Sequence, residues 1–184
     1  MTGDAAQPGP SRATELVLVS DTHARWIPDE VWAAVEAADL VVHAGDWTDV
    51  ATHDAFLARS RHLLACWGNN DGDDLRARMP EVARTTVGGL RLAVLHETGD
   101  AKGRERRCDA WFGPDADAPA DVVVFGHSHI PWDTTTPGGV RLLNPGSPTD
   151  RRRQPFCTFM SGSVRDGALT ITRHDLPPRT GRRS

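Results

Sequence analysis

Five short apolar runs in this 184-residue chain each end in polar residues of the types that bind metal ions. The runs are rich in Val and Leu and have the length of buried β-strands. They lead into Asp21-Thr22-His23, Asp46, Asn69, His96 and His127-Ser128-His129. Side chains that follow the carboxyl ends of neighbouring strands meet at one edge of an open α/β sheet. The sequence therefore predicts a fold in which seven nitrogen and oxygen ligands come together.

Helical patterns separate the first strands, and hairpins dominate the second half of the chain. Residues 28–39 and 52–60 are predicted helices, and residues 102–113 form a third despite their charge run. Gly88-Gly89 and Asp166-Gly167 predict the turns of two hairpins. This order of elements predicts a mixed α/β architecture with more than one sheet.

Length and composition indicate one ordinary soluble domain, with 39% hydrophobic and 25% charged residues. We expect the domain to span residues 15–176, between a disordered leader at 1–14 and a disordered basic tail at 177–184. A net charge of −4 argues against stable nucleic-acid binding. No run approaches the roughly 18 apolar residues of a membrane span, and no secretory signal is visible. With three cysteines that lack C-x-x-C spacing, we expect a cytoplasmic monomer or homodimer with reduced thiols.

The number and type of the ligands favour two metal ions. Seven ligands are too many for one tetrahedral zinc, and they suit two divalent ions about 3.5–4 Å apart that share a carboxylate. The D-x-H and H-x-H spacings fit, because residues two apart in an extended segment point the same way. Any one of these motifs alone is more often a turn or a buried polar contact. All five in one chain favour a metal site.

The ordered set of motifs resembles that of the calcineurin-like metallophosphoesterases. The matching motifs are SDTH, HAGD, GNND, LHE, GHSH and NPGS. The chain is most similar to the small single-domain bacterial and archaeal branch, whose members act as phosphodiesterases. The resemblance covers Leu16 to Ser147 and implies two mixed β-sheets packed face to face and flanked by helices.

The resemblance also assigns the metal ligands. It implies that Asp21, His23 and His129 hold the first ion, that Asp46 bridges, and that Asn69, His96 and His127 hold the second. Mixed histidine and carboxylate ligation favours manganese, iron, zinc or nickel over magnesium. The implied reaction is attack on phosphorus by a hydroxide that bridges the ions, with the metals and the surroundings of His127 stabilising the added charge.

The expected function is therefore a metal-dependent hydrolase of a small phosphodiester. One alternative is a phosphomonoesterase. Another is a non-catalytic metal-binding scaffold, because the small subunit of the retromer complex shares this fold and works as a binding protein with a degraded site. Intact ligands argue against the scaffold.

Two positions depart from the pattern of the family. Asn70, a candidate catalytic residue with His127, stands where many members have a histidine and where the small branch often has a cysteine. An amide can donate a hydrogen bond but cannot deliver a proton, so general-acid help of up to ~10²–10⁴-fold is expected to be absent. In the HET stretch at 96–98, where the branch commonly has His-Gly-His, Glu97 and Thr98 change the wall of the site.

Four tryptophans, Trp26, Trp47, Trp67 and Trp132, lie close to metal motifs in the sequence. We expect Trp26, Trp47 and Trp132 to contribute to an aromatic rim that stacks on a base or aryl group of the substrate. Core packing or a dimer contact remains an equal alternative for each. Arg151 is a candidate contact for a substrate phosphate, although a solvated charge run is the simpler interpretation of residues 151–153.

Overall fold

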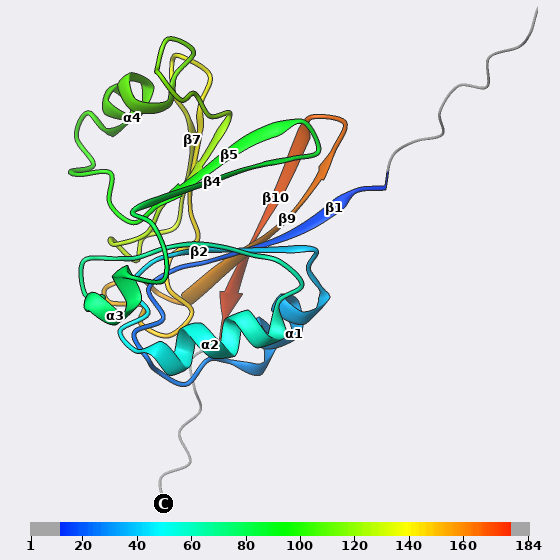
Figure 1. Cartoon of the computed structure of the whole chain (residues 1–184), viewed down its shortest axis with the longest axis vertical. Coiled ribbons are helices and arrows are strands. Elements are labelled where there is room, and N and C mark those ends of the chain that lie inside the picture. Colours follow the sequence, from blue (N-terminus) through cyan, green and yellow to red (C-terminus); the bar gives the residue numbers. More distant parts are fainter. Residues whose placement is uncertain (1–11, 178–184) are drawn as a thin grey trace, which may run out of the picture.

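Two five-stranded β-sheets pack face to face in the computed structural model, which describes residues 12–177 (Figure 1). The first sheet has the order β10-β9-β1-β2-β3 and consists of β1 (Thr14–Val19), β2 (Leu40–Ala44), β3 (Leu63–Cys66), β9 (Cys157–Arg165) and β10 (Ala168–Leu176). The second has the order β4-β5-β6-β8-β7 and consists of β4 (Val82–Val87), β5 (Leu90–Leu95), β6 (Val122–Val124), β7 (Trp132–Thr135) and β8 (Arg141–Asn144). Both sheets are mixed, with parallel centres formed by β1-β2-β3 and β5-β6-β8. The predicted fold class is confirmed.

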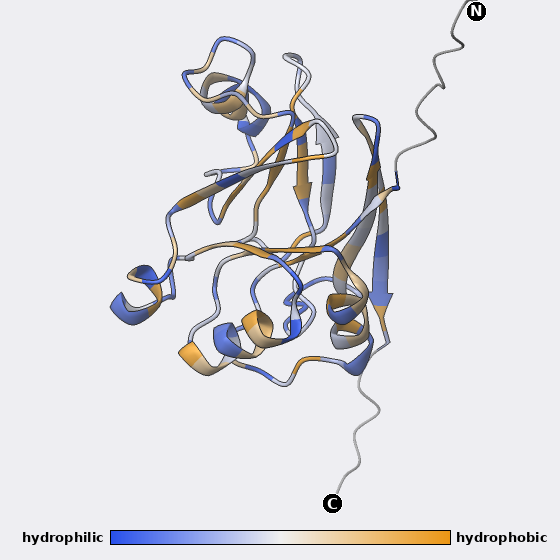
Figure 2. Ribbon diagram, turned by 45° about the vertical axis from the view of Figure 1, so that its right-hand side comes forward, coloured by the Kyte–Doolittle hydropathy of each residue, from blue (hydrophilic) through white to orange (hydrophobic). Residues whose placement is uncertain are grey.

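Helices cover the outer faces of the two sheets (Figure 1). They are α1 (Asp29–Ala37), α2 (Val50–Arg59), α3 (Asp73–Arg76) and α4 (Arg104–Phe112). Successive side chains of a strand point to opposite faces, so each central strand is buried on both sides. In β1, Val17 and Val19 join the core beneath α1 and α2, whereas Leu18 joins the core between the sheets. Figure 2 shows hydrophobic residues along the strands of both layers.

Both predicted hairpins form where the glycine signals lie. Gly88 and Gly89 have φ of 53° and 85° between β4 and β5, and Asp166 and Gly167 have φ of 51° and 76° between β9 and β10. Two-residue hairpin turns with positive φ at both central positions match the right-handed twist of the strands. The predicted helices at 28–39, 52–60 and 102–113 correspond to α1, α2 and α4. The short elements α3 and β7 were not predicted.

The predicted leader and tail are described only in part, because residues 1–11 and 178–184 lie outside the described residues. Within the described part, Arg12 forms an ion pair with Asp39 at 3.1 Å, and Thr14 already opens β1. None of the helices between residues 12 and 177 is long and apolar enough to cross a membrane.

Candidate metal centre

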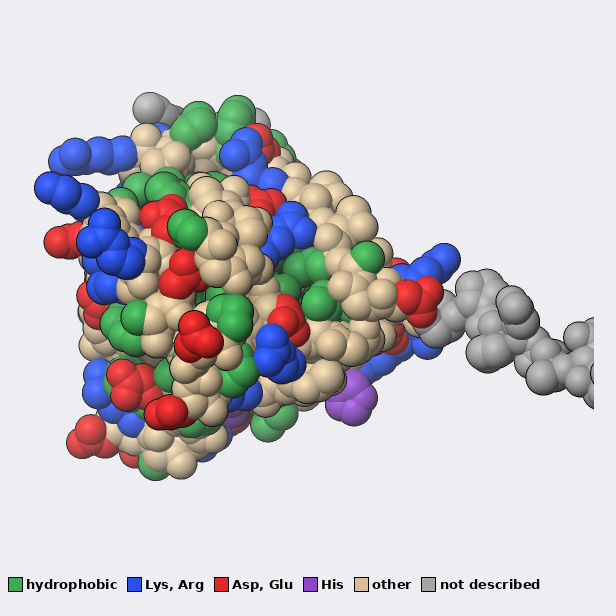
Figure 3. Space-filling model, turned by 90° about the horizontal axis from the view of Figure 1, so that it is seen from above, with side chains coloured by type: hydrophobic (Ala, Val, Ile, Leu, Met, Phe, Trp, Pro, Cys, Tyr) green, Lys and Arg blue, Asp and Glu red, His purple; other side chains and the backbone are tan. Residues whose placement is uncertain are grey.

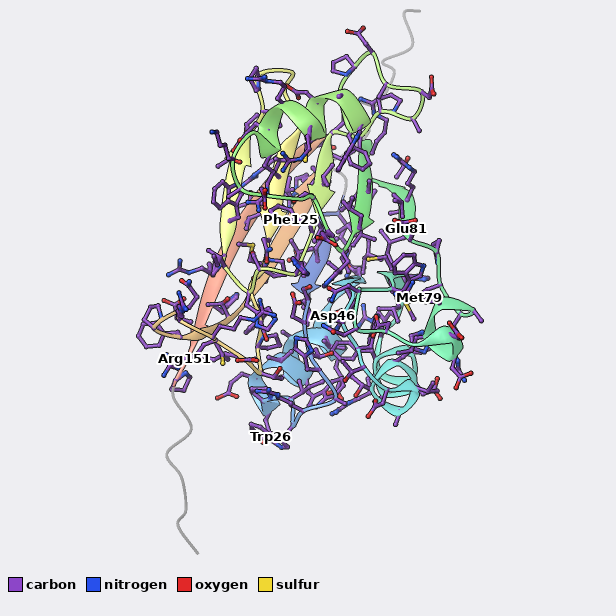
Figure 4. All side chains as sticks on the ribbon, turned by 90° about the vertical axis from the view of Figure 1, so that its left-hand side faces the viewer. Trp26, Asp46, Met79, Glu81, Phe125 and Arg151 are labelled. Atoms are coloured by element: carbon purple, nitrogen blue, oxygen red, sulfur yellow. The ribbon has the colours of Figure 1, made fainter. Side chains whose placement is uncertain are left out.

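The seven predicted ligands meet where the strand ends of the two sheets face each other. Asp21 and His23 follow β1, Asp46 follows β2, Asn69 follows β3, His96 follows β5, and His127 and His129 follow β6. In Figure 4, Asp46 lies in the middle of the molecule among side chains from several elements. A chain of distances between 2.8 and 3.9 Å connects all seven side chains.

The first ligand group consists of Asp21, His23 and His129. Nε2 of His129 lies 3.3 Å from Oδ1 of Asp21 and 3.0 Å from Nε2 of His23. Donor atoms that bind one ion at about 2.0–2.2 Å lie about 3–3.5 Å from one another, so this spacing suits a shared ion. Nδ1 of His129 lies 2.6 Å from the backbone carbonyl of Asp150, which can only accept. Nδ1 therefore carries the proton, and Nε2 presents its lone pair to the group.

The second ligand group consists of Asn69, His96 and His127. Oδ1 of Asn69 lies 3.0 Å from Nε2 of His96 and 2.8 Å from Nδ1 of His127. Nδ1 of His96 donates to the carbonyl of Ala44 at 2.6 Å, which leaves the lone pair of Nε2 directed into the group. The same tautomer argument thus holds for a histidine in each group.

Asp46 lies between the two groups. Its Oδ1 is 3.4 Å from Nε2 of His96, and its Oδ2 is 3.9 Å from Nε2 of His23. Each oxygen thus faces a different group, as a bridging carboxylate requires. Asp21 also belongs with Asp46 and His96 to a set of potential ligand atoms that all lie within 4.8 Å of one another.

A buried carboxylate oxygen that lacks a hydrogen-bond donor shows that these residues fit divalent cations. Oδ1 of Asp21 is buried and has no hydrogen-bond partner, whereas its Oδ2 accepts from Ser20 Oγ at 2.6 Å and from the backbone N–H of His127 at 3.0 Å. A buried carboxylate oxygen without a donor is costly unless a cation compensates it. The free oxygen faces the lone pair of His129, which is an arrangement that a metal ion satisfies.

Burial and neighbouring charges shift the pKa values of three of these residues in different directions. Burial lowers the pKa of His23, although Asp21 and Asp46 act in the opposite direction, so the ring is held neutral and able to bind a metal. Burial also acts to lower the pKa of His96, but Asp46 and Asp21 prevail and raise it. Burial would raise the pKa of Asp46, yet His96 and two donors of Asn70 hold it well below its ordinary value.

Asn70 supports Asp46 through both of its nitrogen atoms. Its backbone N–H donates to Oδ1 at 2.9 Å, and its side-chain Nδ2 donates to Oδ2 at 2.7 Å. The side chain is therefore engaged with the bridging carboxylate in this structure. Its predicted catalytic role toward the leaving group stays a prediction.

Asp71 has a structural role that the sequence analysis missed. Its buried carboxylate accepts from the backbone N–H groups of Asp46 at 3.1 Å, Thr48 at 2.8 Å and Gly68 at 2.7 Å. It thus ties the loop after β2 to the loop after β3. Gly68 allows this approach, because a Cβ there would lie 2.2 Å from Oδ1 of Asp46.

Trp47 lies in the core and takes no part in the predicted aromatic rim, whereas the role of Trp132 in that rim stays a prediction. Trp47 is fully buried, stacks on His43 with 3.4 Å between ring centroids, and donates from Nε1 to the carbonyl of Cys66 at 3.0 Å. Trp132 is half-buried, donates to Thr134 Oγ1, and packs against the Arg104 guanidinium on the α4 side of the second sheet. The core-packing alternative holds for Trp47, and no substrate could stack on its ring.

Trp26 and Arg151 lie on the same side of Asp46 (Figure 4). Both line a cavity of about 540 Å³, together with Arg25, Asp150 and Phe156. Trp26 is 53% exposed. The cavity borders the first ligand group, because the carbonyl of Asp150 accepts from His129.

Arg152, the neighbour of Arg151, contacts a ligand loop. Its Nη1 donates to the backbone carbonyl of His127 at 3.1 Å. Nη1 of Arg151 donates instead to the carbonyl of Gln154 at 2.7 Å. Arg151 thus lines the cavity, whereas Arg152 contacts the ligand loop at His127.

Proteins of similar sequence include probable metallophosphoesterases from archaea and bacteria. A probable metallophosphoesterase from Methanocaldococcus jannaschii is 31% identical over 154 residues, which cover 81% of this chain and 75% of that protein. A solution structure of a Thermotoga maritima protein matches with a TM-score of 0.69 and 25% identity, over 89% of this chain and 99% of the other. A structure described as that of a novel archaeal phosphodiesterase matches with a TM-score of 0.60 and 18% identity, over 87% and 99%. Residues 15–167 match the calcineurin-like phosphoesterase superfamily domain, and the chain belongs to that superfamily.

Proposed function

We propose that this chain is a phosphodiesterase that works with two divalent metal ions, chosen from manganese, iron, zinc and nickel by the mixed ligand set. The observation that carries the proposal is the position of Asp46. One of its oxygens faces His96 of the second group, and the other faces His23 of the first. An ion in each group would lower the pKa of a shared water and neutralise charge on the phosphoryl oxygens.

The charges around His127 support a diester as the substrate. The Glu97 carboxylate lies 3.7 Å from Nε2 of His127, and the Arg152 guanidinium binds the carbonyl of the same residue. A phosphodiester carries one negative charge, whereas a monoester carries close to two at neutral pH. A carboxylate at the mouth of the site therefore disfavours the monoester more strongly.

The test is metal content and hydrolysis in the purified full-length chain. We expect about two transition metals per chain and faster hydrolysis of bis(p-nitrophenyl) phosphate than of p-nitrophenyl phosphate with added Mn²⁺. Asp46→Ala should lose both metal and activity, because the carboxylate contacts both groups. Asp29→Asn, on the exposed first turn of α1, is the matched control and should retain both.

Three results would contradict the proposal in different ways. A metal-free chain that hydrolyses the diester would remove the role of the ions. Faster hydrolysis of the monoester would reverse the substrate assignment. Metal binding without hydrolysis of either ester would identify a non-catalytic metal-binding protein.

A further inference from the structure

A groove leads from the second ligand group across the end of the second sheet toward α4. Its inner part is a cavity of about 70 Å³ that is lined by the ligands Asn69 and His96 and by Trp67, Glu81, Leu95 and Glu97. Its outer part, of about 610 Å³, shares Glu81, Leu95 and Glu97 and extends to Trp111. We call the groove lined by Trp67, Glu81, Leu95, Glu97 and Trp111 the acidic groove. In Figure 4, Glu81 lies on the opposite side of Asp46 from Trp26.

The carboxylates of the acidic groove are available to a ligand. Glu81 is exposed, and its side chain makes no hydrogen bond or ion pair within residues 12–177. Glu97 is also exposed, and its contact in the described structure is the 3.7 Å approach to His127. Two carboxylates beside a metal centre create a negative potential that attracts a cation and repels a second anion.

The basic residue in the lining of the groove does not cancel this charge. Arg84 lines the outer part, but its Nη1 donates to the carbonyl of Ala118 at 2.8 Å and its guanidinium lies 5.0 Å from the Phe112 ring centroid. The inner cavity, next to the ligands, has no Lys or Arg in its lining as described. Figure 3 views the molecule from the α4 end, where acidic, basic and hydrophobic side chains are interspersed. Among the described residues, the lining of the inner cavity thus contains two carboxylates and no Lys or Arg side chain.

An exposed aromatic ring at the outer end of the groove can also bind a cation. At the inner end the Trp67 ring is already engaged, because the Arg76 guanidinium lies 4.2 Å from its centroid. The Trp111 side chain is 46% exposed at the outer end. Carboxylates combined with exposed aromatic rings are a common surrounding for amine and quaternary ammonium groups.

We infer that the acidic groove binds a positively charged ester group of the substrate, such as an aminoalkyl or trimethylammonioalkyl group, while the phosphate lies at the ligand groups. This inference rests on the proposed phosphodiesterase function. It adds a substrate class, namely diesters that carry a cation on one ester arm. The groove then acts as a charge filter against diesters with a second anionic group.

The experiment compares two substrates of the same shape and different charge. One is p-nitrophenyl phosphocholine, and the other is its 3,3-dimethylbutyl analogue, in which a tert-butyl group replaces the trimethylammonium group. We expect the choline ester to have a kcat/KM about 5- to 10-fold higher, the size expected of two exposed ion pairs. The preference should shrink in 0.5 M NaCl, because exposed charges are screened.

The variants assign the preference to the groove. Glu81→Gln should halve the logarithm of the kcat/KM ratio of the choline ester to its analogue. It should leave hydrolysis of bis(p-nitrophenyl) phosphate unchanged. Adding Glu97→Gln should bring the ratio of the two substrates close to one. Glu30→Gln, an exposed glutamate on α1 outside the groove, is the matched control and should keep the wild-type ratio.

The outcomes separate this inference from the proposed function. Equal kcat/KM for the two esters in the wild type, with bis(p-nitrophenyl) phosphate still hydrolysed, would overturn the inference and leave the phosphodiesterase standing. A preference that survives in the double variant would also overturn it, because the charge would come from elsewhere. A wild type that hydrolyses none of the three diesters would overturn both.

Discussion

Removing the side chain of Asn70 tests how the bridging carboxylate is held. In Asn70→Ala the 2.7 Å hydrogen bond from Nδ2 to Asp46 Oδ2 is lost, while the 2.9 Å bond from the backbone N–H to Oδ1 remains. A hydrogen bond to a charged group contributes about 1.5–3 kcal/mol, and partial exposure places this one at the lower end. About 1.4 kcal/mol corresponds to a tenfold change in an equilibrium constant.

We therefore expect Asn70→Ala to bind Mn²⁺ about tenfold more weakly than the wild type. The assay is calorimetric titration of metal-depleted protein, with circular dichroism to establish that both proteins are folded. Asn70→Gln is the matched variant, because it keeps the amide donor and should recover part of the affinity. Equal Mn²⁺ affinities for the wild type and Asn70→Ala would refute the argument that Asn70 positions Asp46.

The same position is predicted to control the choice of leaving group. Since the Asn70 amide cannot deliver a proton, hydrolysis rates should fall steeply as the pKa of the leaving group rises. Asn70→His should flatten this dependence and accelerate alkoxide substrates most, by about tenfold or more. The measurement is a series of aryl and alkyl diesters on the wild type and Asn70→His at matched metal content. Equal slopes would show that position 70 takes no part in protonation of the leaving group.

Three further predictions follow from burial and from the ligand set. Trp47→Ala should destabilise the chain by about 3–5 kcal/mol in urea unfolding, whereas Trp26→Ala should leave stability unchanged and raise KM for an aryl diester. At pH 8 a thiol reagent should label half-buried Cys157 before Cys108. Burial raises the pKa of Cys108 to about 11, so only about 10⁻³ of it is thiolate at this pH. Labelling of Cys108 before Cys157 in the folded chain would contradict this. Mn²⁺ at about 100 times its Kd should stabilise the chain by about 2.7 kcal/mol and raise Tm by about 5–10 °C for each occupied site, with no shift in Asp46→Ala.

The residues that gather at the site could be predicted from the sequence, because each follows an apolar run typical of a buried strand. Val17 and Val41 are as apolar as their neighbours and mark β1 and β2 as strands with both faces covered. A parallel arrangement then brings the following Asp21 and Asp46 to the same edge. The two hairpins could also be predicted, because their turns need positive φ and contain Gly or Asp at the central positions.

The direction of a side chain within a loop could not be predicted in the same way. Trp47 directly follows Asp46, and proximity in sequence suggested a shared surface. Asp46 has a φ of 60° and Thr48 a φ of 68°, so the chain reverses locally and turns Trp47 into the core beneath α2. The elements α3 and β7 were missed because their sequences, DDLR and WDTT, contain no apolar run.

Left-handed backbone at the ligands explains why the ligand geometry depends on the assembled sheets. Five of the seven ligand residues have positive φ, between 52° and 69°: Asp21, His23, Asp46, His127 and His129. Such conformations cost of order 1–3 kcal/mol each in a residue other than glycine, and they persist only where surrounding contacts enforce them. Here the loops enforce one another. The backbone N–H groups of Asp21 and His23 donate to the carbonyls of Gly45 and Asp46 at 2.9 and 3.0 Å, and the N–H of His127 donates to Asp21 Oδ2. The β1 loop is thus held by the β2 loop, and it holds the β6 loop of the other sheet in turn. The β1–α1–β2 segment thus contains contacts that hold its own ligand loops, whereas the β6 loop also depends on a carboxylate from the other sheet.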